Sequence, residues 1–164
     1  MSAARSISDD RHRGRVAALQ LLYQLEFGGV SPSEVDEMAR RYWTEHPVPE
    51  GHRSFATTLL QGTVERRDQI DPLIEGAADN WRLSRMSVVD RTILRLAVYE
   101  LLTAVAPPAV VINEALELAK TFGGEESSGF VNGVLDAVKR VLEKQSNLPR
   151  LPMELEAQDP KIGT

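Results

Sequence analysis

The sequence contains no cysteine, no long apolar run and no excess of basic charge, and each absence excludes a class of protein. Without cysteine the chain forms no disulfide scaffold, Cys-ligated zinc site, iron–sulfur cluster or catalytic thiol. The longest mainly apolar stretch, residues 101–112, contains Pro107 and Pro108 and is too short to cross a membrane. The first residues include no apolar stretch that could act as a signal peptide. We therefore expect a soluble, cytoplasmic protein.

The charge balance limits how the chain can bind nucleic acid. Nineteen Lys and Arg residues stand against 24 Asp and Glu residues, which gives a net charge of −5. A protein of this charge does not coat nucleic acid with its whole surface. Any nucleic-acid site must therefore be a local basic patch.

The spacing of apolar residues predicts an all-α protein with about seven helices, because no segment alternates with a period of two over a useful length. The predicted helices span residues 10–27, 31–46, 50–68, 71–80, 87–105, 109–121 and 126–144. Residues 1–9 are small and polar and are predicted to form a flexible arm. The tail, 146–164, has three prolines and no periodicity, which predicts mobility. Residues 10–145 are therefore the expected folded domain.

Two helix starts have clear capping signals. Ser31 is followed by Pro32 and Glu34, which is the pattern of a capping box, and Ser87 precedes Asp90 in the same way. A weak internal similarity is also present, since Arg15 and Tyr23 are separated by eight positions, as are the arginine and tyrosine at 91 and 99. This internal similarity reflects either two similar helical halves or coincidence.

No enzyme motif is present. The three histidines lack metal-ligand spacing, and there is no Glu-x-x-His pair, phosphate-binding GxxxxGK[ST] loop or G-x-S-x-G nucleophile elbow. Acidic pairs such as Glu114 and Glu117 lie on single predicted helices, where solvated carboxylates are common. We expect no catalytic residue, no metal and no cofactor.

A basic cluster at the start of the chain is the first candidate site. Four of the 15 arginines fall within the first 15 residues, and a histidine lies among them: Arg5, Arg11, His12, Arg13 and Arg15. Free backbone N–H groups and arginine side chains at a helix start together favour anions, and the planar guanidinium matches phosphate. The alternative is a solvated helix start that Asp9 and Asp10 partly neutralise.

The second candidate site begins at Lys120 and Phe122, beside two glycines at the end of a predicted helix. An accessible aromatic ring close to a lysine is suited to stacking on a nucleobase. The alternative is that Phe122 and Phe130 close the helical core. Trp43 and Trp81 are predicted to be core residues rather than ligand contacts.

Three stretches of the sequence resemble the NusB transcription antitermination factor family. They are RHRGRVAALQLLYQLEFG, DNWRLSRMSVVDRTILRLAVYEL and PPAVVINEALELAKTFGGEESSGFVNGVLDAV, and they keep their order and spacing over roughly residues 11–141. The string INEALELAKTFG followed by FVNGVLD is highly specific to that family.

The resemblance implies a fold of two packed helical bundles with an extra helix, and a function without catalysis. Family members pair with NusE, a small-subunit ribosomal protein, and the pair binds boxA RNA of ribosomal RNA leader transcripts. Together with other Nus factors on RNA polymerase, they suppress premature termination and assist ribosomal RNA maturation.

By position in the family's motifs, two groups of residues receive expected roles. The residues expected to bind RNA are Arg11, His12, Arg13, Arg15, Phe122, Glu126 and Phe130, with Lys120 close by. Tyr23 and Asp90 are expected to face NusE. Asp90 is also a candidate capping carboxylate, and the two roles are compatible.

Several features depart from the family pattern or leave alternatives open. Asp9 and Asp10 lower the charge of the basic cluster, and Gly14 replaces a better helix former at a cost of up to about 1 kcal/mol. The first turn is therefore expected to order on RNA. An RNA-binding accessory domain of an rRNA-modifying system and a purely structural adaptor are the alternative functions. A monomer and a homodimer are both compatible with the sequence.

Overall fold

The computed structural model describes residues 2–28, 31–79 and 81–147, and every regular element among them is helical. The described residues form seven α-helices, which are α1 (Ser2–Gly28), α2 (Val35–Glu45), α3 (Glu50–Glu65), α4 (Arg67–Ala77), α5 (Val88–Thr103), α6 (Pro108–Phe122) and α7 (Ser127–Asn147). The same residues form two short 3-10 helices, which lie between α1 and α2 (Pro32–Glu34) and between α4 and α5 (Leu83–Arg85). The predicted all-α class is confirmed. No described helix is both long enough and apolar enough to cross a membrane.

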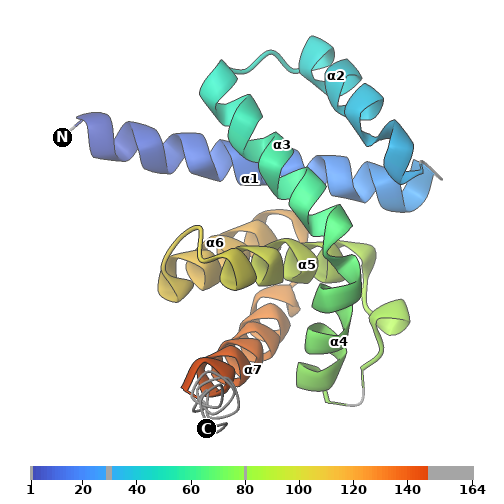
Figure 1. Ribbon diagram of the computed structural model, residues 1–164, viewed down its shortest axis with the longest axis vertical. Helices are drawn as coiled ribbons and strands as arrows, with labels where there is room; N and C mark the ends of the chain where they lie inside the picture. Colours follow the sequence, from blue (N-terminus) through green and yellow to red (C-terminus); the bar gives the residue numbers. More distant parts are fainter. Residues whose placement is uncertain (1, 29–30, 80, 148–164) are drawn as a thin grey trace, which may run out of the picture.

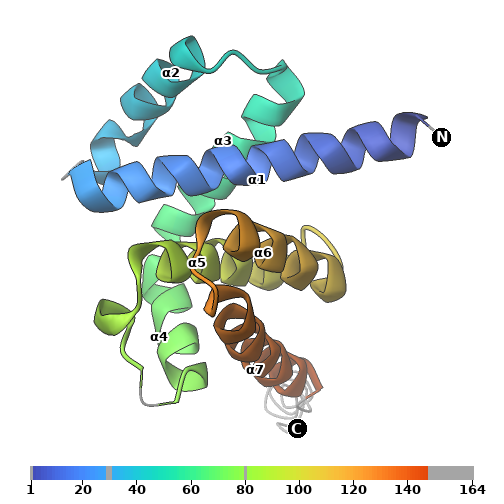
Figure 2. The same ribbon diagram turned by 180° about the vertical axis from the view of Figure 1, so that it is seen from behind.

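The helices form two groups that meet at α1, α3 and α5. Figure 1 shows α1 lying across the molecule, with α2 on one side, α4–α7 on the other, and α3 crossing α1 to reach the second group. Figure 2 shows the same arrangement from behind, with the N-terminal end of α1 extending beyond the other helices. Helix α5 contacts α1, α3, α4, α6 and α7. It is therefore the central element on which both groups rest.

The sequence of α5 explains its central position. Every residue from Thr92 to Glu100 is buried, and Ile93, Leu94 and Val98 have no exposed surface. Truncating a buried side chain of this size to alanine typically costs about 2–5 kcal/mol. Helix α3 approaches closely because Gly62 leaves room for a ring: a Cβ at this position would lie 2.2 Å from Cζ of Tyr99.

Both predicted helix-start signals are present. The hydroxyl of Ser87 accepts a hydrogen bond from the backbone N–H of Asp90, at 3.1 Å, and caps α5. At the other start, the Glu34 carboxylate accepts hydrogen bonds from the backbone N–H and the hydroxyl of Ser31, each at 2.9 Å. Both bonds lower the pKa of Glu34, and the bond from the backbone N–H has the larger effect. Helix α5 therefore begins where the sequence predicts, whereas the turn after Ser31 is the 3-10 helix Pro32–Glu34 and α2 itself begins at Val35.

The two similar segments, residues 15–23 and 91–99, lie on helices that contact each other. Helices α1 and α5 run antiparallel (Figure 1), and an ion pair joins them at each end of the contact. Arg15 on α1 pairs with Glu100 on α5, and Arg91 on α5 pairs with Glu26 on α1. The arginine that begins each segment thus binds a carboxylate that follows the other segment.

Three expectations differ from the structure. Residues 2–9 continue α1 rather than forming a separate arm, since no proline or glycine interrupts the chain before Gly14. Helix α4 begins at Arg67, so Pro72 lies inside it and removes one backbone hydrogen bond. Trp81 is 53% exposed instead of buried, because it lies in the irregular segment after α4. Most of the predicted tail, 148–164, lies outside the described residues.

Candidate nucleic-acid interface

The described side chains of the basic cluster differ in exposure: Arg15 is buried, Arg11 and His12 are half-buried, and Arg13 is exposed. Arg15 faces inward and is only 3% exposed. Its Nη2 lies 2.8 Å and its Nε 3.0 Å from the two carboxylate oxygens of Glu100, which is itself 2% exposed. Oε2 of Glu114 lies 3.7 Å from Nη1. A buried guanidinium held by carboxylates has no face left for a phosphate, so the structure gives Arg15 a structural role in place of the expected RNA contact.

Arg11 and His12 attach α1 to the rest of the protein while remaining partly accessible. Nη1 of Arg11 donates to the carbonyl of Val105 at 3.3 Å, and the guanidinium lies 5.2 Å from the centre of the Phe55 ring. Nδ1 of His12 is 2.8 Å from Oε2 of Glu114, and the histidine side chain is 42% exposed. Both side chains are half-buried, so phosphate would reach only their outer edges.

Arg13 is the exposed arginine of the cluster. Its side chain forms no hydrogen bond or ion pair with any other residue that the structure describes. Asp10, one of the two carboxylates expected to neutralise the cluster, contacts Nε2 of the buried His52 of α3. Its carboxylate therefore points toward α3 and forms no ion pair with Arg13, while the side chain of Arg5 lies outside the described part of the molecule.

Gly14 is explained by packing. A Cβ at this position would lie 2.7 Å from Cδ1 of Phe55 on α3. The glycine therefore lets α1 and α3 approach closely at the point where the Phe55 ring also lies under Arg11 and Arg15. The lower helix propensity of glycine is the cost of this close contact.

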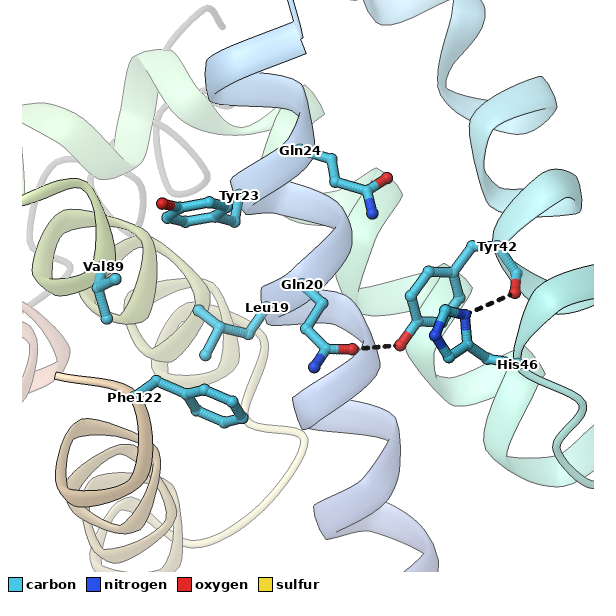
Figure 3. A pocket seen from close by; sticks show the side chains of 8 residues that line it. All are labelled: Leu19, Gln20, Tyr23, Gln24, Tyr42, His46, Val89 and Phe122. Atoms are coloured by element: carbon cyan, nitrogen blue, oxygen red, sulfur yellow. Dashed lines mark hydrogen bonds between the residues drawn. The ribbon is translucent and has the colours of Figure 1, made fainter.

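An open groove of about 580 Å³ runs along α1 beyond the basic cluster. It is lined by side chains of α1, α2, α5 and α6: Leu19, Gln20, Tyr23, Gln24, Tyr42, His46, Val89 and Phe122. Figure 3 shows Leu19 and Gln20 in the middle of this groove, with Tyr23, Val89 and Phe122 on one side and Tyr42 with His46 on the other. We call it the α1 groove.

The two aromatic rings at the α5–α6 side of the α1 groove are accessible. Phe122 is 37% exposed at the end of α6, and Tyr23 is 40% exposed on α1, where its ring lies 4.7 Å from that of Phe27. Phe122 therefore does not close the core, and its ring is accessible for stacking on a nucleobase. The structure brings this residue, expected to bind RNA, into the same groove as Tyr23, expected to face NusE.

The opposite side of the α1 groove is polar and ordered by hydrogen bonds. The hydroxyl of Tyr42 donates to the amide oxygen of Gln20, and the ring of His46 stacks on Tyr42 with centroids 4.3 Å apart (Figure 3). Burial raises the pKa of Tyr42, so its phenol stays protonated at neutral pH. Sequence reasoning did not single out Gln20 as a site residue.

A second hollow, of about 620 Å³, contains three further expected residues, one from the NusE group and two from the RNA group. Asp90, Glu126 and Phe130 line it, together with Trp81 and Arg85. The rings of Trp81 and Phe130 meet edge to face at 6.3 Å, and Phe130 also packs against the core. Oδ1 of Asp90 is buried and has no hydrogen-bond partner among the described residues. Asp90 as a whole is half-buried, so part of its side chain borders the hollow while Oδ1 is enclosed.

Lys120 lies on the outer surface of α6. Its Nζ is 3.6 Å from Glu117 one turn away, and the side chain is exposed. An exposed pair of this kind is weak, so the lysine remains available to a phosphate. Among the described residues, no group of three His, Asp or Glu side chains is arranged to hold a metal ion.

Comparison with known proteins places the fold and the sequence in one family. A family model described as the NusB family matches residues 12–140. The transcription antitermination protein NusB of Syntrophus aciditrophicus is 43% identical over 138 residues, which cover 84% of each chain. That of Myxococcus xanthus is 47% identical over 136 residues, covering 82% of this chain and 97% of the relative.

Solved structures agree with this similarity. T. maritima NusB superposes with a TM-score of 0.70 at 37% identity, covering 79% of this chain and 90% of that one. A structure of the antitermination factors NusB and NusE in complex with dsRNA contains a chain that is 27% identical, with a TM-score of 0.69. The match covers 81% of this chain and 98% of that chain.

Proposed function

Because this chain belongs to the NusB family, we propose that it is a transcription antitermination factor that binds boxA RNA of ribosomal RNA leader transcripts together with NusE. In this role it joins other Nus factors on RNA polymerase in the cytoplasm, suppresses premature termination and assists ribosomal RNA maturation. It acts by binding and not by catalysis. The similar structure of NusB and NusE with dsRNA supports the choice of both partners.

The observation that carries the RNA-binding part of the proposal is the exposed guanidinium of Arg13 on the same helix as the α1 groove. Phosphate contacts set the register of an RNA strand, and base contacts and stacking supply sequence preference. Arg13, the outer edges of Arg11 and His12, and Lys120 supply the first kind of contact. The accessible ring of Phe122 supplies the second.

The NusE contact is proposed for Tyr23 and Asp90. Tyr23 offers an exposed ring with a polar tip, a combination that is enriched at protein interfaces. Asp90 lines the second hollow and is half-buried, so the open part of its side chain offers negative charge to a donor from NusE. Glu126 and Phe130 share the hollow with Asp90 and are proposed to border the RNA where it passes NusE.

Fluorescence anisotropy of a labelled boxA RNA, titrated with this protein alone and with NusE, tests the proposal. We expect binding to strengthen with NusE, to prefer boxA over a scrambled strand and to weaken with salt. With about three phosphates neutralised, the log–log slope is near −2, at about −0.7 per single-strand phosphate. Absence of specific binding under both conditions would favour the structural adaptor instead.

A further inference from the structure

We infer that Gln20 is a base-reading residue: its amide N–H donates to a keto oxygen of a nucleobase bound in the α1 groove. This inference rests on the proposed RNA-binding function and names which residue gives it sequence preference. It assigns the groove a chemical selectivity for uracil over cytosine, two pyrimidines of the same size that differ by a keto oxygen and an amino group at the same position.

The first step is the position of Gln20 relative to the phosphate-binding residue. Gln20 follows Arg13 by seven residues, which is close to two helical turns, so both side chains project from one face of α1. At 1.5 Å per residue, their separation along the helix axis is about 10 Å. A strand whose phosphate is held by Arg13 therefore continues along that face into the α1 groove.

The second step is the fixed orientation of the Gln20 amide. A glutamine side chain usually offers both a donor and an acceptor, and it rotates to suit its partner. Here the Tyr42 hydroxyl donates to the amide oxygen, so the acceptor is used and the NH₂ group remains for a ligand (Figure 3). The stacked ring of His46 and the edge contact with Trp43 hold Tyr42 in place. The donor is thus positioned before RNA arrives.

The third step is the shape and chemistry of the groove around that donor. Leu19 and Val89 supply apolar surface, and the half-exposed ring of Phe122 lies across from the amide (Figure 3). An aromatic ring accepts the face of any base, whereas a fixed hydrogen-bond group selects among bases by their edges. The keto oxygen at position 2 is common to both pyrimidines, but at position 4 uracil has a keto oxygen that accepts from an amide N–H, while cytosine has an amino group that is itself a donor. In the inferred contact, the Gln20 amide lies against the position-4 edge. A donor at Gln20 therefore favours uracil.

The test is a comparison of two labelled single-stranded RNAs of equal length, one all-uridine and one all-cytidine, by fluorescence anisotropy with the full-length protein. The ratio of the two dissociation constants is the readout, because changes in overall charge or stability affect both RNAs alike. One net hydrogen bond gives a uridine preference of about 2- to 12-fold for the unmodified protein.

Gln20→Glu is the decisive variant, since the carboxylate turns the donor into an acceptor that suits the cytosine amino group. We expect the uridine preference to disappear or reverse. Gln69→Glu is the matched control: it adds the same charge at an exposed position of α4 outside the α1 groove, so the ratio is kept. Tyr42→Phe releases the Gln20 amide and lowers the ratio, and circular dichroism confirms that each variant remains helical.

Three results would overturn the inference. An unchanged uridine-to-cytidine ratio in Gln20→Glu would show that Gln20 does not read the base, and so would equal binding of both RNAs by the unmodified protein. Loss of NusE affinity in Gln20→Glu with an unchanged ratio would assign the groove to the protein partner. In each case binding of boxA RNA by the unmodified protein would leave the proposed function standing, whereas its absence with and without NusE would remove both.

Discussion

The inward orientation of Arg15 predicts that this residue supports the fold and not the RNA contact. The perturbation is Glu100→Gln, which removes the carboxylate charge but keeps the shape of the side chain. Arg15 is then a buried cation whose remaining carboxylate neighbour is 3.7 Å away, on Glu114. Removing one partner of a buried ion pair typically costs about 3–5 kcal/mol. For a protein of this size the thermal midpoint falls by roughly 6–20 °C.

A second variant separates the charge from the packing. Arg15→Met with Glu100→Leu replaces both members of the pair by apolar side chains of similar length. Such replacements are often neutral or stabilising, because the cost of desolvating two charges is removed. We expect the double variant to recover most of the stability that Glu100→Gln loses. Thermal unfolding followed by circular dichroism measures both effects.

Arg13→Ala is the matched surface variant. Its stability should change by no more than about 0.5 kcal/mol, because the side chain is exposed and unpaired among the described residues. Its affinity for boxA RNA should fall, and the salt slope should become shallower by about 0.7, which corresponds to one lost phosphate contact. The Arg15 and Glu100 double variant should keep both the affinity and the slope. If it instead stays stable but loses affinity and slope as Arg13→Ala does, Arg15 is a phosphate ligand and the argument from burial is wrong.

Three shorter predictions follow from other contacts. Tyr23→Asp should weaken NusE binding in a pull-down titration more than it weakens RNA binding by the protein alone, and equal losses would contradict the partner role. Gly62→Ala should lower stability by about 1–3 kcal/mol, since the added Cβ meets the Tyr99 ring, whereas Gly76→Ala, with nothing within 4 Å, should not destabilise. Ala104→Gly should raise the free energy of unfolding by about 1 kcal/mol, because Ala104 has a left-handed φ of 51°; no gain in urea denaturation would show that the backbone is unstrained there.

The sequence was sufficient to predict the helical class and most helix positions, because these depend on local spacing and on turn residues. Ser87 caps α5 as predicted, and α1 ends at Gly28 as its glycine pair indicates, whereas Ser31 precedes a 3-10 turn and α2 begins only at Val35. The start of α4 was predicted too late, since proline favours the first turn of a helix, whereas Pro72 lies in the second turn of α4. The exposure of Trp81 depends on contacts between distant segments, which spacing alone does not report.

The site was harder to predict because it depends on which side of a helix each residue occupies. Family resemblance supplied the candidate residues but did not separate those that contact a ligand from those that support the fold. Gly14 illustrates the difficulty: in sequence it is a poor helix former, and its reason is the Phe55 ring of another helix. The enclosed Oδ1 of Asp90 and the fixed amide of Gln20 likewise follow from neighbours on other elements.

Helical geometry nevertheless accounts for the division of the basic cluster. At about 100° per residue, Arg13 lies roughly 200° from both Arg11 and Arg15, while those two lie only about 40° from each other. When Arg11 and Arg15 both face the Phe55 ring, as they do, Arg13 must face away from it. Gln20 is about 20° from Arg13 on the same projection, so the exposed charge and the fixed donor share one face. The described arginines of this compact cluster thus divide into one exposed side chain in line with the α1 groove, Arg13, and two side chains that pack against Phe55, Arg11 and Arg15.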